Sequence, residues 1–333
     1  MYRSRVAGMG FYVPKNVVTN DDLAKMFDTS DEWIVQRTGI KERRYADDGE
    51  GVSDMALIAT RRCLEDAGAT ADEIDFIVLA SLSPDYCFPG SSAFLQDYLG
   101  IKPTPAVDIR AQCTGFLYSL AIADQFIKTG MYRTVLVVGG EVHSTGIEFS
   151  NRGRAVTVLF GDGAGAVLLK RAEEGQNDHI ILSSHLYCEG KYAKKLWTEY
   201  PASKLRPRLT KEGLDEGRHY PQMDGKFVFR HAIERMPEVI LEALSANGYT
   251  INDLDLLIPH QANLRINEFV QKKLGLPDEK IFNNIQKYGN TTAATIPICM
   301  VEAREAGILK EGSLVCLAAF GSGFTWGATL LQW

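Results

Sequence analysis

LEDAGATADEIDFIVLAS (residues 64–81) and LSANGYTINDLDLLIPHQ (residues 244–261) share one pattern, which is the main evidence for the fold in this sequence. Each stretch runs from the end of a helix-like segment, through a glycine and an acidic turn, into a short apolar run typical of a buried strand. Gly68 matches Gly248, which sets the offset between the two stretches at 180 residues. The same order of features at a fixed offset indicates an internal duplication.

The offset holds beyond these two stretches, without a gap. RTVLVVGGE (133–141) matches SLVCLAAFG (313–321), again 180 residues further along the chain. Four apolar strands in equivalent places predict an α/β protein with two similar halves, each with a sheet and covering helices. We place the two halves at residues 1–172 and 173–333.

A lone cysteine stands where a strand stops and a helix begins, in DIRAQCTGFLYSL (108–120). Apolar residues then recur at helical spacing as far as Gly130, which predicts a helix that begins close to Cys113. The free N–H groups and the dipole of a helix N-terminus would stabilise a thiolate there and lower its pKa. The alternative is a small buried cysteine that only fills a gap in the core.

Two further polar residues are expected near this cysteine. Under the 180-residue offset Cys113 aligns with Ala293, so the two central helices would start close together and bring Asn290 to the thiol. His260 follows the second copy of the buried strand, at a strand end. A hydrogen-bonded loop histidine and an N-terminal helix cap are the alternatives for these two residues. Their convergence with a helix-start cysteine favours an active site.

Composition excludes several functional classes. The 333 residues are 45% hydrophobic and 23% charged, and the net charge of −6 argues against general nucleic-acid binding. No apolar run approaches the ~20 residues of a membrane helix, and no secretion signal precedes the first strand. The six cysteines lack framework spacing, which favours reduced thiols and a cytoplasmic protein. His185-x-x-Cys188 has no second pair, so we predict no metal site.

Six motifs, in order along the chain, resemble those of the β-ketoacyl-acyl carrier protein synthase III family, condensing enzymes of the thiolase superfamily. The motifs are TSDEWIVQRTGIKERR (29–44), AQCTGF (111–116), FGDGAGAVLL (160–169), PHQANLRI (259–266), GNTTAATIP (289–297) and FGSGFTWGATL (320–330). The resemblance implies a thiolase-like, duplicated α-β-α-β-α sandwich with two five-stranded sheets, usually a homodimer.

The resemblance also implies an activity. An acyl-CoA starter would condense with malonyl-acyl carrier protein, with loss of carbon dioxide, to give a 3-oxoacyl-acyl carrier protein and initiate fatty-acid synthesis. An alternative keeps the fold and chemistry but uses a long-chain or specialised starter for a secondary metabolite, hydrocarbon or cofactor precursor. A silent relative that only binds acyl groups is a third hypothesis, against which the intact cysteine, histidine and asparagine argue.

Individual roles follow from the same resemblance. Cys113 would carry the acyl group as a thioester, and His260 and Asn290 would bind the thioester carbonyl of the malonyl group. No cofactor is implied, since acyl-CoA and malonyl-acyl carrier protein are substrates. The remaining implied contacts are Trp33, Arg37, Arg152, Gly225 and Asn263 for coenzyme A, Gln261, Arg265, Lys272 and Lys273 for the carrier protein, and Phe88 for the acyl pocket of a neighbouring subunit.

The chemistry needs these residue types. Transthioesterification requires a thiolate, and decarboxylation leaves an enolate whose charge falls on the thioester oxygen. Two neutral N–H donors can hold that oxygen, and the backbone N–H groups of Cys113 and Ser322 would form a second oxyanion hole. The family often has glycine where Ser322 stands, and a serine adopts fewer backbone conformations than a glycine. The sequence alone does not settle whether the Ser322 N–H has the orientation that the oxyanion hole needs. Degradative thiolases use a second cysteine where Phe320 stands, which favours the decarboxylating route.

Two basic regions are candidate contacts for an acidic carrier protein. Arg265, Lys272 and Lys273 follow His260 on one predicted helix, and seven residues separate Arg265 from Lys272, so both can share a face. The segment 191–211 holds seven Lys or Arg and one Glu. A solvated flap and a role in shaping the acyl tunnel are both open for this segment.

Overall fold

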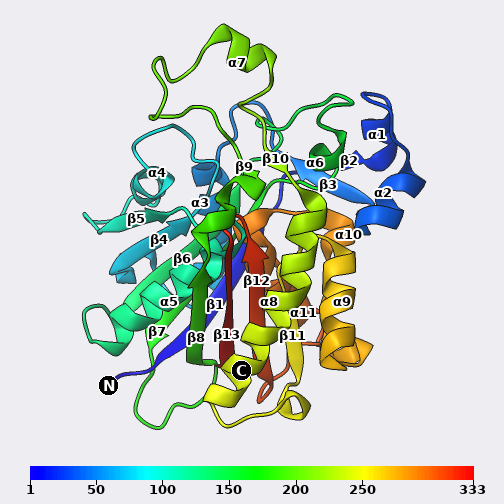
Figure 1. Ribbon diagram of the computed structural model, residues 1–333. Coiled ribbons are helices and arrows are strands. Elements are labelled where there is room, and N and C mark those ends of the chain that lie inside the picture. Colours follow the sequence, from blue (N-terminus) through cyan, green and yellow to red (C-terminus); the bar gives the residue numbers. More distant parts are fainter.

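A nine-stranded mixed sheet runs through the molecule (Figure 1), and the computed structural model describes residues 1–333. The strand order is β11-β12-β13-β8-β1-β7-β6-β4-β5. In chain order the strands are β1 (Ser4–Tyr12), β4 (Phe76–Ala80), β5 (Ala106–Ile109), β6 (Thr134–Glu141), β7 (Gly163–Arg171), β8 (Ile180–Cys188), β11 (Leu256–Pro259), β12 (Leu314–Gly321) and β13 (Thr325–Gln332).

The sheet joins two groups of strands, one from each half of the chain. The first group contains β1, β7, β6, β4 and β5, and the second contains β8, β13, β12 and β11. They meet between β1 and β8, through the pair Arg5 and Ile180. The two sheets expected from the family are therefore continuous here, and the second half contributes four strands rather than the expected five. In the second half a single parallel bridge between Leu257 and Ile281 stands beside β11, where the first half has β5.

Two buried helices form the middle layer, and they start face to face. They are α5 (Gly115–Lys128) and α11 (Thr295–Glu305), and a 3₁₀ turn precedes each, at Gln112–Thr114 and Thr292–Ala294. These elements lie 180 residues apart, as the repeat predicts. A Cβ built on Gly115 would lie 3.6 Å from the Cβ of Ala293, so small residues let the helix starts meet.

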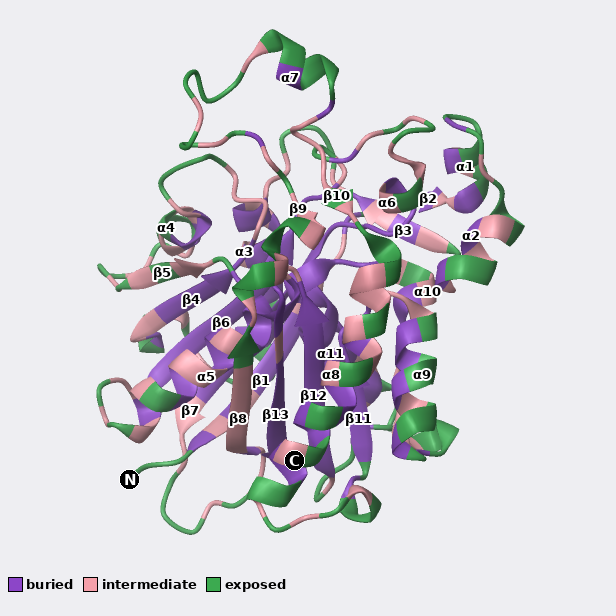
Figure 2. Cartoon of the chain, in the orientation of Figure 1, coloured by how far each residue is buried: buried purple, intermediate pink, exposed green.

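Outer helices cover the remaining faces of the sheet. α3 (Val52–Asp66) packs on β1 and β7, and α8 (Gly225–Ala246) packs on β12 and β13, with α9 (Leu264–Leu274) beside it. Because both faces of the central strands are covered, every residue of β6 and of β12 is buried, which explains why both are almost entirely apolar, with Thr134 and Glu141 as the polar ends of β6. Figure 2 shows this pattern as a buried centre with exposed outer faces on α8 and α9.

Shorter elements surround the end of the sheet at which the helices start. They are β2 (Asn16–Thr19), α1 (Asn20–Ala24), α2 (Asp31–Thr38), β3 (Glu42–Tyr45), α4 (Ser91–Tyr98), α6 (Arg154–Thr157), β9 (Leu196–Trp197), α7 (Lys211–Asp215), β10 (Gln222–Met223) and α10 (Ile285–Tyr288). The excursion that carries α7 projects from the body of the molecule (Figure 1). All six cysteines are free, and none of the helices combines the length and apolarity needed to cross a membrane.

Candidate active site

A cavity of about 640 Å³ opens beside the start of α5, and Cys113, His260 and Asn290 all line it. Cys113 comes from the turn before α5, His260 directly follows β11, and Asn290 precedes the turn before α11. All three are buried, with exposed fractions of 8% or less. The structure thus brings together the three residues that the sequence singled out.

A tight turn aims Cys113 into the cavity. The preceding residue, Gln112, has φ of 46°, in the left-handed region that residues other than glycine rarely adopt. Strained backbone of this kind persists where the surrounding structure fixes it, often at functional sites. Gly321, at the end of β12, faces the thiol so closely that a Cβ there would lie 2.8 Å from Sγ. The cysteine is therefore held against β12 by its turn and by the absence of a side chain opposite.

Burial dominates the electrostatics of this thiol. It raises the pKa of Cys113 to about 12, and the nearby carboxyl group of Glu141 adds to the rise. Backbone N–H groups of Ser322 and of Cys113 itself lower the pKa in part, since they hydrogen-bond the sulfur. The expected lowering of the pKa by the helix N-terminus is therefore wrong, because desolvation of the charged form outweighs it. Glu141 is itself fully buried, which raises its pKa to about 8.

His260 presents one ring nitrogen to the cavity. Its Nδ1 lies 2.7 Å from Oγ1 of Thr295, while its Nε2 is buried and has no hydrogen-bond partner. Burial lowers the pKa of His260 to about 3, so the ring is neutral at pH 7. The Thr295 hydroxyl can give its single proton either to Nδ1 or to the carbonyl of Thr292, which lies 3.0 Å away. The first choice places a proton on Nε2, and the second leaves a lone pair there.

The side-chain oxygen of Asn290 accepts a hydrogen bond, and its side-chain nitrogen has no hydrogen-bond partner within the chain. Oδ1 accepts a hydrogen bond from the backbone N–H of Thr292 at 2.8 Å. The main chain of Asn290 is also fixed, since its N–H donates to the carbonyl of Leu159 at 2.8 Å. Asn290 is not a helix cap, however, since Thr291 and Ala294 are the N-cap residues of the 3₁₀ turn and of α11. Because the side-chain oxygen is engaged, the amide Nδ2 remains as the donor toward the cavity.

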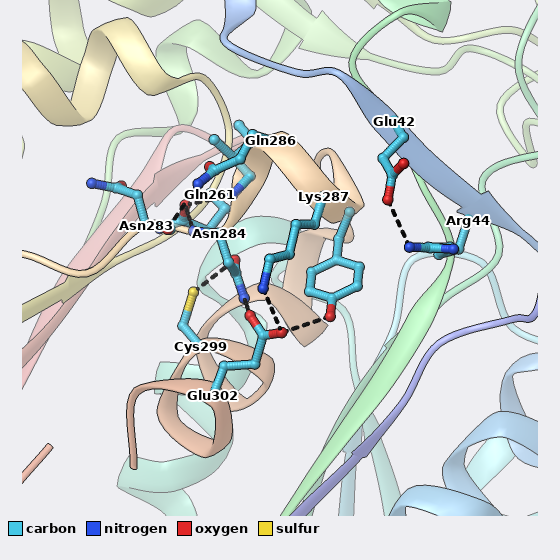
Figure 3. A network of polar contacts seen from close by, with 11 residues as sticks. Glu42, Arg44, Gln261, Asn283, Asn284, Gln286, Lys287, Cys299 and Glu302 are labelled. Atoms are coloured by element: carbon cyan, nitrogen blue, oxygen red, sulfur yellow. Dashed lines mark hydrogen bonds and ion pairs between the residues drawn. The ribbon is translucent and has the colours of Figure 1, made fainter. Parts of the chain in front are cut away.

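A network of polar side chains, in which Gln261 and Asn284 are buried, holds the segment before Asn290 (Figure 3). Oε1 of Gln261 accepts from the backbone N–H groups of Asn284 and Ile285, both at 3.2 Å. The amide of Asn284 donates to Glu302 at 2.9 Å. These bonds fix the start of α10, which leads directly to the loop with Asn290. Gln261 is fully buried, so the expectation that it contacts a carrier protein is wrong.

The mouth of the cavity carries most of the residues expected to bind coenzyme A. Trp33, Arg37, Gly225 and Asn263 line it, together with Arg265. Asn263 caps α9, because its Oδ1 accepts from the N–H of Arg265 at 3.0 Å, and its Nδ2 donates to the carbonyl of Arg37 at 3.1 Å. The Asn263 side chain therefore links the main chains of Arg37 and Arg265, and both arginines line the cavity.

Arg152 differs from the expectation. It forms an ion pair with Glu148 at 2.8 Å, its Nη1 donates to the carbonyl of Asp215 at 3.3 Å, and it is not among the cavity-lining residues. Arg154 instead lies over Trp33, with its guanidinium carbon 4.7 Å from the ring centroid. Sequence reasoning missed Arg154, and the repeated basic residue in NRGRAV was the signal that could have found it.

The other predicted residues lie at the surface or the rim. Arg265, Lys272 and Lys273 are all exposed on α9, and their role in docking stays a prediction. Phe88 is 83% exposed and does not line the cavity of its own chain. The hydroxyl of Ser322 donates to the carbonyl of Leu196, which lies within the basic segment 191–211 and lines the cavity. That segment therefore supplies part of the cavity wall.

Comparisons with known proteins show the family to which the chain belongs. The family model described as 3-oxoacyl-[acyl-carrier-protein (ACP)] synthase III matches residues 107–190, and its C-terminal counterpart matches residues 244–333. A β-ketoacyl-[acyl-carrier-protein] synthase III of Xanthomonas oryzae is 44% identical over 333 residues, covering 99% of this chain and 98% of the relative. One of Rhodospirillum centenum is 45% identical, covering 99% of each. The crystal structure of 3-oxoacyl-[acyl-carrier-protein] synthase III from Aquifex aeolicus superposes with a TM-score of 0.90 at 43% identity, covering 99% of this chain and 100% of that one.

Proposed function

This chain belongs to the β-ketoacyl-acyl carrier protein synthase III family, and we propose that it condenses an acyl-CoA starter with malonyl-acyl carrier protein. The product is a 3-oxoacyl-acyl carrier protein, and the reaction initiates fatty-acid synthesis. One observation carries the assignment. Beside the buried thiol of Cys113, an unpartnered Nε2 of His260 and an amide nitrogen of Asn290 converge on one cavity, two neutral donors at one reaction centre.

In the first half-reaction the sulfur of Cys113 attacks the thioester carbonyl of acyl-CoA, and coenzyme A leaves as its thiol. The backbone N–H groups of Cys113 and Ser322 point toward the sulfur, so they are placed to stabilise the oxyanion that forms on the acyl carbonyl. Because the thiol has a raised pKa, it needs a proton acceptor. The tautomer of His260 with a lone pair on Nε2 is the neutral base in the same cavity.

In the second half-reaction the malonyl group loses carbon dioxide, and the negative charge passes to its thioester oxygen. The other tautomer of His260 donates Nε2–H to this oxygen, and the Nδ2–H of Asn290 is the second donor. The α-carbon then attacks the acyl carbonyl, forms the new carbon–carbon bond and releases the sulfur of Cys113. A neutral imidazole suits this step, because an imidazolium would protonate the carbanion.

Substrate delivery uses the outer part of the same cavity. Trp33 and the guanidinium groups of Arg37 and Arg154, 4.6 and 4.7 Å from its ring, suit an adenine nucleotide, since both stacking and phosphate charge can be satisfied there. The exposed basic residues on α9 suit an acidic carrier protein. The proposed working unit is a homodimer, in which the exposed Phe88 of a second copy closes the acyl pocket, as the family resemblance implies.

A two-step assay tests this function. The protein is incubated with a panel of acyl-CoAs from short to long chain, the acyl group on Cys113 is detected by mass spectrometry, and malonyl-acyl carrier protein is then added. We expect a thioester on Cys113, none on Cys113→Ser, and conversion to 3-oxoacyl-acyl carrier protein. Preference for a long-chain starter would instead indicate a specialised pathway, and no acylation by any starter would contradict the assignment.

A further inference from the structure

A second buried histidine lies behind the active site and has no role in the reaction described above. His143 follows the end of β6 by two residues and is 5% exposed. Its Nε2 lies 2.6 Å from Oγ1 of Thr292, which has no other side-chain partner. Its ring stacks on Phe160, with centroids 4.3 Å apart and an interplanar angle of 28°. His143 therefore contacts two residues, and both of them hold Asn290.

The first contact, Thr292, sets the direction of the Asn290 side chain. Its backbone N–H donates to Oδ1 of Asn290 at 2.8 Å. Thr292 has φ of 48°, a left-handed conformation that is unfavourable for a β-branched residue. Such a conformation needs contacts that keep it in place, and the bond from Oγ1 to His143 is the side-chain contact that does so.

The second contact, Phe160, sets the position of the Asn290 main chain. Phe160 and Asn290 form an isolated parallel β-bridge. In this bridge Asn290 donates to the carbonyl of Leu159 at 2.8 Å, and Gly161 donates to the carbonyl of Asn290 at 3.2 Å. The imidazole of His143 lies against the ring of Phe160 and so supports the strand segment that carries the asparagine.

His143 is itself firmly placed. Its backbone N–H donates to Oδ1 of Asp162 at 2.6 Å, and Asp162 also accepts from the backbone N–H of Ser144 at 3.0 Å. Burial lowers the pKa of His143 to about 3, so the ring is neutral at pH 7 and one ring nitrogen carries a lone pair. A neutral ring both stacks on Phe160 and forms the bond to Thr292 without placing a charge in the core.

We propose that His143 is a positioning residue that, through Thr292 and Phe160, holds the amide nitrogen of Asn290 toward the thioester oxygen of the malonyl group. This inference rests on the proposed function, because it assigns a task within the second half-reaction. It differs from a packing role in one respect. A ring of similar size without a hydrogen-bonding nitrogen would fill the same space and still stack on Phe160. It would not hydrogen-bond Thr292, so the orientation of the Asn290 amide would no longer be fixed.

Two variants of His143 separate these roles. His143→Phe keeps the stacking on Phe160 and removes the bond to Thr292, whereas His143→Gln keeps a hydrogen-bonding group close to the position of Nε2. Thr292→Val removes the same bond from the other side and keeps the shape. For each variant we would measure self-acylation from acyl-CoA, kcat and KM for malonyl-acyl carrier protein, and the melting temperature.

We expect His143→Phe to lower kcat with malonyl-acyl carrier protein about tenfold, less than the roughly hundred- to thousandfold loss for a missing oxyanion donor. The rate of self-acylation and the KM for malonyl-acyl carrier protein should stay within about twofold of wild type. Neither depends on the hydrogen bond from Asn290, which stabilises only the transition state of decarboxylation. His143→Gln should recover kcat to within about threefold, and the double variant His143→Phe with Thr292→Val should lose no more than either single variant.

Other outcomes overturn the inference. Equal losses in both half-reactions, or no loss of kcat, would reduce His143 to a packing residue. If His143→Phe does not fold, Thr292→Val decides, and an unchanged kcat in that variant refutes the proposal. A wild-type protein that acylates but never decarboxylates malonyl-acyl carrier protein would instead refute the proposed function.

Discussion

Replacing Gly321 by alanine should displace the nucleophile. The added Cβ would lie 2.5 Å from the Cβ of Cys113 and 2.8 Å from its Sγ, and 3.4 Å from its Cα. Carbon atoms in contact prefer about 3.5 to 4.0 Å, so the cysteine or the end of β12 must move by about 1 Å. A displacement of this size at a reacting group costs on the order of a hundredfold in rate. Overpacking of a buried site also costs about 1–3 kcal/mol in the free energy of unfolding.

The assay is single-turnover acylation of Cys113 by acyl-CoA, followed by mass spectrometry, with melting temperatures measured in parallel. Gly190→Ala is the matched control, since no atom lies within 4 Å of a Cβ at that position. We expect about a hundredfold slower acylation and a lower melting temperature for Gly321→Ala, and wild-type values for the control. If Gly321→Ala acylates at more than half the wild-type rate, the thiol does not lie against β12 as described.

Three further predictions concern charge. Since burial raises the pKa of Cys113 to about 12, alkylation of this residue by iodoacetamide should accelerate about tenfold per pH unit from pH 7 to 9, and a plateau in the peptide-mass data would contradict this. Arg154→Ala should raise KM for acyl-CoA about fivefold, and Arg152→Ala by less, because Arg154 lies over Trp33; equal effects would contradict the structure. In the folded protein Glu141 keeps its proton up to about pH 8, whereas in the unfolded chain it releases the proton near its ordinary, lower pKa. The wild-type protein therefore loses stability as the pH rises between these two pKa values, and Glu141→Gln does not. The melting temperature of Glu141→Gln relative to wild type should rise from pH 5 to pH 8, and a constant difference would refute this.

The sequence predicts the duplicated frame well because its signals are local. Buried strands need unbroken apolar runs, and glycines in the left-handed region end the preceding helices, as at Gly68 and Gly248, with φ of 57° and 77°. The 180-residue offset between Gly68 and Gly248 recurs in the two 3₁₀ turns, so alignment of Cys113 with Ala293 located the meeting point of the central helices. A repeat carries such positions because each copy must bury the same faces.

Properties that depend on distant packing were not predictable in this way. The pKa of Cys113 depends on how completely three-dimensional neighbours exclude water, which outweighs the local helix N-terminus. Gln261 stands next to His260 in the sequence, yet its side chain turns inward to backbone groups near Asn284. Arg154 is two positions from Arg152 and makes different contacts, because Arg152 lies in the turn before α6 and pairs with Glu148, whereas Arg154 begins α6 and lies over Trp33.

The duplication explains how one backbone geometry serves two chemical tasks. Gln112 and Thr292 are equivalent in the repeat, and both are left-handed, with φ of 46° and 48°. In the first half this conformation aims the next residue, Cys113, into the cavity, and in the second half it turns a backbone N–H onto the side chain of Asn290. The two turns share one cavity because the chain near Ala293 packs directly against β6. A Cβ on Gly139 of β6 would lie 2.3 Å from the carbonyl oxygen of Ala293, so only glycine allows this contact. Nucleophile and amide donor are thus brought together by the same close contact that joins the two halves, so a change that separates the halves would impair both half-reactions at once.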